Sequence, residues 1–138
     1  MSPTEVSGTG LAVRIAEAAL GLEGVRSAVV CGEDGSVLAA AGCEEPARDA
    51  ALASFVAMRA EALPVDGDLR GMGKQLAGSH FAHLAISGER NDGLLLGIGN
   101  AYLYVTTPPG RGALALPPLT NIARRYGGAN LTARSQQP

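Results

Sequence analysis

The feature that most constrains the fold is a series of tight-turn signals between short apolar segments. Asp34-Gly35 separates expected strands at 25–31 and 36–41, and both residues tolerate the positive φ angles of a two-residue hairpin turn. Further turns are expected at 89–93 and at Gly99-Asn100. The three strands around these turns are predicted over 81–87, 94–98 and 101–106. Because hairpin-length connections join antiparallel neighbours, the sequence predicts a mostly antiparallel sheet.

Apolar residues at helical spacing predict three helices around these strands. The helices cover 11–20, 46–63 and 117–126, and the last two begin near Pro46 and at Pro117, since proline is favoured in a first turn. The order of elements is then α-β-β-α-β-β-β-α. The sequence therefore predicts an α+β fold, an α/β/α sandwich with a five-stranded antiparallel sheet and helices on both faces. We expect a single domain over 11–127, with flexible tails at 1–10 and 128–138.

The composition excludes several classes of function. The formal net charge is −2 at pH 7 and Lys74 is the sole lysine, so the chain offers no clustered basic face to nucleic acid or to an anionic membrane. No window approaches the roughly 18 uncharged apolar residues of a membrane-spanning helix. We expect a cytoplasmic protein in which Cys31 and Cys43 are free thiols.

The residue types that usually carry catalysis are not grouped in the sequence. His80 and His83 are three residues apart and would project to opposite faces of a strand, which disfavours a metal site. The segment from Gly71 to Lys74 lacks the glycine spacing and the Ser or Thr of a phosphate-binding loop. The sequence therefore favours a binding module without a cofactor over an enzyme.

The helix predicted over 46–63 has too few charges for an ordinary surface helix. No charged residue occurs from Ala50 to Met58. A helix that is apolar nearly all round is usually buried on two sides, so we expect one side on the sheet and the other at an interface between two copies. The residues expected at that interface are Ala50, Ala53, Ser54 and Ala57. The alternative interpretation is a solvent-exposed face of alanines, which helices tolerate well.

The stretch GVRSAVVCGEDGSVLAAAG at 24–42 resembles the opening hairpin of the roadblock/dynein light chain family. The matching positions are Gly24-Val25 before the first strand and Asp34-Gly35 at the turn, and Asp92-Gly93 matches a later turn of the family. The element order is also that of the family, so the resemblance covers about 11–126. It implies a profilin-like sandwich with the second helix on one face of the sheet and the first and third helices on the other. It also implies a homodimer through the second helix and the third strand, which adds Phe81 and His83 to the expected interface.

The same resemblance implies a function. Bacterial members are similar to a gliding-motility protein that regulates a Ras-like GTPase, and they act by binding rather than by catalysis. Such a regulator must bind the two nucleotide states of the GTPase with different affinities. We therefore expect a non-catalytic homodimer that binds a bacterial Ras-like small GTPase. The candidate contact residues are Arg48, Arg59, Arg70 and Lys74, for which solvated charge is the alternative interpretation.

A second hypothesis is a small-ligand sensor or adaptor of the same architecture. Its pocket would be lined by Tyr102, Tyr104 and Phe81, which alternate on the predicted strands. The simpler interpretation of these aromatic residues is that they belong to the structural core.

Overall fold

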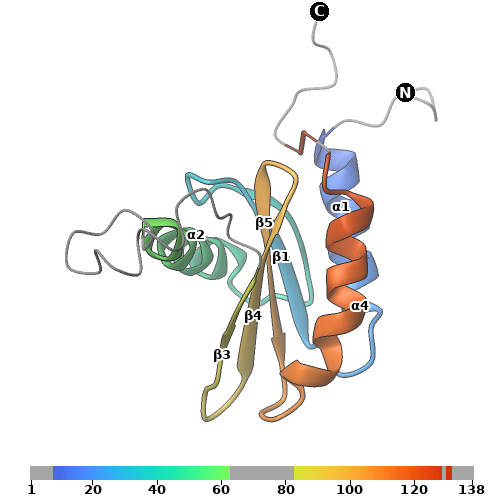
Figure 1. Ribbon diagram of the computed structural model, residues 1–138, viewed down its shortest axis with the longest axis vertical. Coiled ribbons are helices and arrows are strands. Elements are labelled where there is room, and N and C mark those ends of the chain that lie inside the picture. The colour runs from blue at the N-terminus through green and yellow to red at the C-terminus, as the bar shows by residue number, and fades with distance from the viewer. Residues whose placement is uncertain (1–7, 63–82, 129, 132–138) are drawn as a thin grey trace, which may run out of the picture.

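The computed structural model describes residues 8–62, 83–128 and 130–131, and its elements follow the predicted order (Figure 1). The first half contains α1 (Gly8–Leu20), β1 (Ser27–Cys31), β2 (Val37–Ala41) and α2 (Pro46–Ala62). The second half contains β3 (His83–Ile86), β4 (Asp92–Ile98), β5 (Ala101–Thr107) and α4 (Gly112–Arg125).

The strands form one five-stranded sheet in the order β2-β1-β5-β4-β3, and every neighbouring pair is antiparallel. Three of the pairs are hairpins of consecutive strands. The fourth pair, β1 with β5, joins the two halves of the chain from Ser27↔Thr106 to Cys31↔Tyr102. The predicted fold class, a five-stranded antiparallel sheet between helices, is confirmed.

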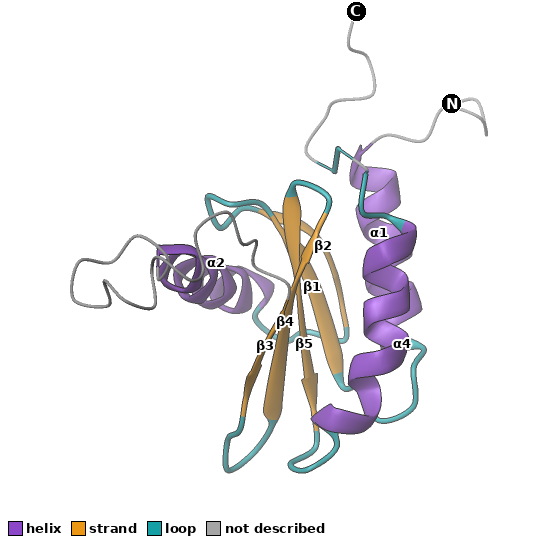
Figure 2. Cartoon of the chain, viewed as in Figure 1, coloured by secondary structure: helices purple, strands orange, loops and turns teal. Residues whose placement is uncertain are grey.

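Helices cover both faces of this sheet, with α1 and α4 on one side and α2 on the other (Figure 2). The core on the α1/α4 side contains Ile15, Val30, Leu103 and Leu119, all fully buried. A smaller cluster lies under α2. Because strand side chains alternate between the two faces, β1 contributes Val30 to the first core and Val29 to the second.

The turn of the first hairpin is held by Asp34. Its Oδ1 accepts hydrogen bonds from the backbone N–H of Ser36 at 3.0 Å and from the Ser36 hydroxyl at 2.7 Å. Both bonds favour the charged form, so they hold the pKa of Asp34 below its usual range. Gly35 adopts a φ of +85°, which L side chains rarely tolerate. Asp34 and Gly35 therefore form the hairpin turn that the sequence predicts.

Helix α4 begins at Gly112, so the start predicted at Pro117 was wrong. Proline is favoured in a first turn, but it does not require one. Ala115 and Leu119 are buried at helical spacing, and their packing onto the sheet extends the helix upstream of Pro117 and Pro118. The two prolines remove N–H groups whose partner carbonyls, four residues earlier, belong to exposed residues that water can solvate.

Both ends of the domain extend beyond their predicted boundaries. Helix α1 already begins at Gly8. After α4, Leu131 is fully buried in the α1/α4 core, and its backbone N–H donates to Oδ1 of Asn100 at 2.8 Å. Nδ2 of Asn100 donates to Oδ1 of Asn130 at 2.7 Å. The prediction of a tail from 128 onward was therefore wrong at 130–131, and residues 1–7 and 132–138 lie outside the described part of the chain.

Candidate functional site

Helix α2 packs its smallest side chains onto the sheet. Ala50, Ala53 and Ala57 are at most 1% exposed and join a buried cluster with Val29 and Tyr102. The volume between helix and strands is filled mainly by the larger sheet residues, so methyl groups suffice on the helix side. The alanine face of α2 is thus an internal packing surface.

This alanine face is the one that the sequence predicted for an interface between copies, and that orientation was wrong. Ala50, Ala53, Ser54 and Ala57 are all buried against the rest of the same chain. The hydroxyl of Ser54 is also satisfied internally, because it donates to the backbone carbonyl of Glu33 at 2.6 Å. In an alanine-rich helix, the hydrophobic pattern does not say which side faces the sheet.

The opposite side of α2 exposes three large apolar side chains. Leu52, Phe55 and Met58 are 46%, 60% and 64% exposed, and a spacing of three residues places them along one side of the helix. Single exposed hydrophobic residues are normal, whereas neighbouring ones mark interaction sites. We call this row the α2 outer face. The prediction overlooked this row, because large apolar residues at this spacing in a sequence are normally assigned to the side that faces the core.

Charged side chains flank the α2 outer face. Cζ of Arg59 lies 5.8 Å from the centroid of the Phe55 ring, within range of a cation–π interaction. Toward the start of the helix, Arg48 forms an ion pair with Glu45 at 3.7 Å, and both side chains are largely exposed. Such pairs contribute only about 0–1 kcal/mol to stability. Both arginines predicted as contact residues on this helix therefore lie on the surface.

Strand β3 forms one edge of the sheet. Among the described residues it pairs with β4 alone, which leaves its other side without a strand partner. An edge of this kind can pair with another chain. His83, one of the predicted interface residues, is exposed on β3. Phe81 and the candidate contacts Arg70 and Lys74 lie outside the described residues.

The two strand tyrosines lie on the α2 side of the sheet. Tyr102 is 6% exposed within the buried cluster, so it acts as a core residue. Tyr104 is half-buried and covers Gly93, where a Cβ atom would lie 2.8 Å from the tyrosine hydroxyl. Burial raises the pKa of Tyr104, and the carboxylate of Asp49 adds to the rise. Because Tyr102 is buried in the core, its side chain is unavailable for the pocket that the second hypothesis requires.

Both cysteines are held as neutral thiols. Burial raises the pKa of Cys31 to about 11, with a further contribution from Asp34. Sγ of Cys43 donates to the carbonyl of Ala28 at 3.3 Å, and burial also raises the pKa of this thiol. Because the thiolate is the reactive form, neither environment activates a nucleophile.

The side chains that commonly bind metals are dispersed over the described part of the chain. Within residues 8–62, 83–128 and 130–131, no group of His, Cys, Asp and Glu side chains is arranged to hold a metal ion. No helix in these ranges combines the length and the apolar character needed to cross a bilayer.

Comparison with solved structures identifies the architecture. The Roadblock/LC7 domain from Streptomyces avermitilis matches with a TM-score of 0.62 at 19% sequence identity, covering 83% of this chain and 95% of that chain. The gliding protein MglB from Thermus thermophilus matches with a TM-score of 0.63 at 21% identity, covering 94% and 100%. The chain has the roadblock fold. A third structure, described as MglB with a tetrameric arrangement, gives a TM-score of 0.54 at 24% identity and covers 91% and 99%.

The sequence by itself carries a weaker signal of this likeness. No protein-family model matches the chain, and no curated protein matches it. At identities of 19–24%, the solved structures share the roadblock fold with this chain while most residues differ. The fold implied by the opening hairpin is confirmed.

Proposed function

We propose that this protein is a homodimeric member of the roadblock family that binds a bacterial Ras-like small GTPase and has no catalytic activity of its own. The observation that carries the proposal is the α2 outer face, an exposed apolar row on a roadblock fold. Two of the three solved structures compared above bear the name MglB, and the resemblance at 24–42 associates the family with small GTPases. A cytoplasmic location and independence from any cofactor belong to the same proposal.

The α2 outer face supports the homodimer. Burying apolar surface contributes roughly 25 cal/mol per Å², and this row leaves Leu52, Phe55 and Met58 in water. A two-fold axis would bring the same face of two copies together. With the two helices antiparallel, Phe55 would lie near the axis, and Leu52 of each copy would face Met58 of the other. The free edge of β3 would let the sheet continue across the two copies.

The homodimer is tested by placing a charge in the row. We expect the wild-type chain to have a dimeric mass at micromolar concentration and the Phe55→Glu variant to have a monomeric mass, measured by light scattering or sedimentation. Val13→Glu is the matched control, because Val13 is 42% exposed on α1, on the other side of the sheet, and this variant should remain dimeric. A monomeric wild type, or a dimeric Phe55→Glu, would contradict the proposed interface.

The regulatory role requires different affinities for the two nucleotide states, because a ligand with equal affinity for both shifts neither population. We expect co-purification with a candidate GTPase to differ between its GTP-loaded and GDP-loaded forms. Replacing Arg48 or Arg59 by Gln tests the exposed cations, and Arg14→Gln on α1 is the control. Equal binding to both forms, or binding to neither, would contradict the regulator. The mass measurement stands apart from this outcome, so the dimer and the regulator can fail separately.

A further inference from the structure

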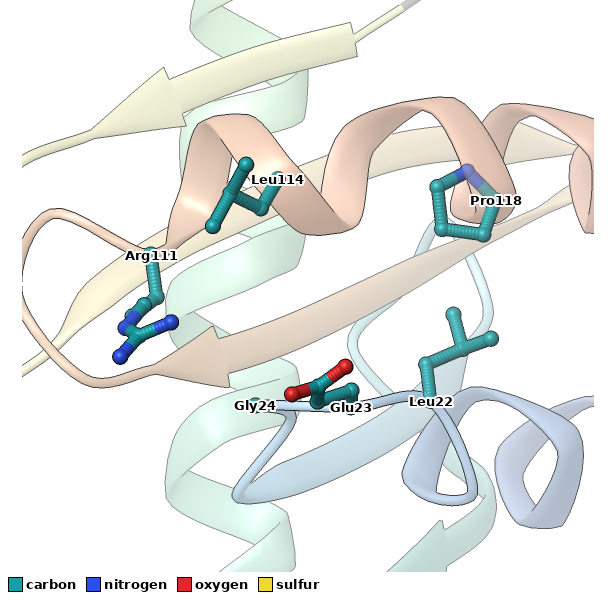
Figure 3. A pocket seen from close by; sticks show the side chains of 6 residues that line it. All are labelled: Leu22, Glu23, Gly24, Arg111, Leu114 and Pro118. Atoms are coloured by element: carbon teal, nitrogen blue, oxygen red, sulfur yellow. The ribbon is translucent and has the colours of Figure 1, made fainter.

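A cavity lies on the α1/α4 side of the sheet, on the opposite side from α2 (Figure 3). It has a volume of about 300 Å³ and is lined by Leu22, Glu23, Gly24, Arg111, Leu114 and Pro118. The residues come from two segments, the connection that follows α1 and the first turns of α4. Ligand sites in proteins span roughly 300–1,000 Å³, so this cavity fits an occupant at the small end of that range.

One part of the cavity is apolar and exists because α4 starts early. A helix that began at Pro117 would lack the turn that carries Leu114, whose side chain is 67% exposed at the wall. Pro118 adds a rigid ring from the following turn, and Leu22 closes the wall from the α1 side (Figure 3). These three side chains offer a hydrophobic surface to a small aliphatic group.

The other part carries one negative and one positive side chain. Glu23 and Arg111 both line the cavity, yet they form no ion pair with each other. Within the described part of the chain, neither side chain has another ion-pair or hydrogen-bond partner. Gly24, in the connection that follows α1, has a φ of +86°, and a Cβ atom there would lie 4.0 Å from Cβ of Arg111. Glu23 and Arg111 are both exposed, so opposite charges border one small cavity without forming an ion pair.

We propose that this cavity binds a free α-amino acid with an aliphatic side chain. The ammonium group would face the carboxylate of Glu23, and the carboxylate would face the guanidinium of Arg111, which suits planar anions. The side chain would contact Leu22, Leu114 and Pro118. A hydrocarbon without charges would gain no interaction with either ion, and an ion of one sign would interact favourably with one of them alone. A small zwitterion with an aliphatic group matches all of the lining at once, which goes beyond the proposed function at α2.

The test uses the full chain, isotope-labelled, with L-leucine as the probe in an NMR titration. We expect saturable shifts of the backbone amide signals of Gly24, Arg111 and Leu114, with an affinity in the millimolar range. Glu23→Gln and Arg111→Gln should each weaken binding about tenfold, because charge-assisted hydrogen bonds are lost. Glu17→Gln on α1 and Arg125→Gln on α4 are matched controls, since both side chains are exposed and do not line the cavity. The spectra also report whether each variant is folded.

Analogues separate a free amino acid from a peptide terminus. Leucinamide lacks the carboxylate and N-acetylleucine lacks the ammonium group, so each should bind about tenfold more weakly than leucine. Glycine retains both charges without the aliphatic group and should also bind more weakly. The proposal is overturned if leucine causes no saturable shifts at these amides. It is also overturned if the Glu23→Gln and Arg111→Gln variants bind leucine as tightly as the wild type does, or if the analogues bind the wild type as tightly as leucine does. The measurement needs no GTPase and no dimer, so its failure would leave the proposal at α2 untouched.

Discussion

The two helical layers of this molecule cover the same sheet in different ways. On the α1/α4 side, large residues such as Ile15 and Leu119 face the strands and are fully buried. On the α2 side, alanines face the strands, and the bulky residues of the helix point outward. One layer completes its core within the chain. In the other layer, α2 has the composition of a helix that is packed on two sides, but described residues cover only one of its sides.

This difference has an energetic consequence. Burial of a leucine or isoleucine side chain contributes about 1.5–3 kcal/mol, whereas a buried alanine adds a single methyl group. Helix α2 therefore gains less free energy from its contact with the sheet than α1 and α4 gain from theirs. A second copy packed on Leu52, Phe55 and Met58 would supply part of that missing burial.

The largest effect is expected in the α1/α4 layer, where one helix carries a buried leucine and an exposed one. Leu119→Ala removes a fully buried side chain and should lower the free energy of unfolding by about 2–5 kcal/mol. Leu114→Ala makes the same change on the same helix, where the side chain is 67% exposed, and should change it by less than about 0.5 kcal/mol. Denaturant unfolding measures both, and equal losses would contradict the assignment of this core.

A smaller effect is expected where α2 meets the sheet. Ala53 is 1% exposed, so Ala53→Leu overpacks the contact and should cost about 1–3 kcal/mol of unfolding free energy. Ala47→Leu is the control, because Ala47 is exposed near the start of the same helix. An Ala53→Leu variant as stable as this control would mean that the alanine face is not the packed one, and the orientation of α2 would have to be revised.

These layers show which parts of the fold the sequence could predict. Turn positions depend on local chemistry, so Asp34-Gly35 and Gly99-Asn100 correctly located two hairpins and the antiparallel sheet. The facing of α2 depends on which neighbour supplies the larger side chains, and a pattern within one helix carries no such information. The start of α4 is similar, because Ala115 belongs to a helix only when the sheet lies beneath it.

The candidate site was harder to predict than the fold for a related reason. Arg48 and Arg59 lie on the surface as expected, because charge alone makes exposure favourable. The apolar row at Leu52, Phe55 and Met58 was overlooked, since large apolar residues are normally assigned to a core. The cavity beside Arg111 joins segments far apart in the sequence, and no local motif marks it.

A hydrogen bond that ties α2 to the first hairpin gives the next effect in size. Ser54→Ala removes the donor to the Glu33 carbonyl and should lower the free energy of unfolding by about 1 kcal/mol. Ser87→Ala, at an exposed position after β3, should leave it nearly unchanged. Thermal or denaturant unfolding compares the two. If the two variants have the same free energy of unfolding, the packing of the alanines alone positions α2 against the hairpin.

The smallest effect compares two carboxylates by their pH dependence. The pKa of Asp34 is lowered in the folded chain, so its contribution to stability is present above the unfolded pKa of about 3.9 and is lost as the pH falls through the folded value. Partial burial raises the pKa of Asp49 on α2, so the effect has the opposite sign: folding disfavours the charged form at neutral pH, and acidification relieves this cost.

Asn at either position removes the titration while keeping an oxygen acceptor. As the pH falls below about 4, the free energy of unfolding of the wild type should therefore decline relative to Asp34→Asn. Relative to Asp49→Asn, the free energy of unfolding of the wild type should rise as the pH falls from neutral to the unfolded pKa of about 3.9, because the folded pKa lies above that value. Unfolding midpoints from neutral pH down to below the unfolded pKa give both differences. Differences of the same sign would mean that the hairpin turn and the α2 layer do not impose opposite environments on their carboxylates.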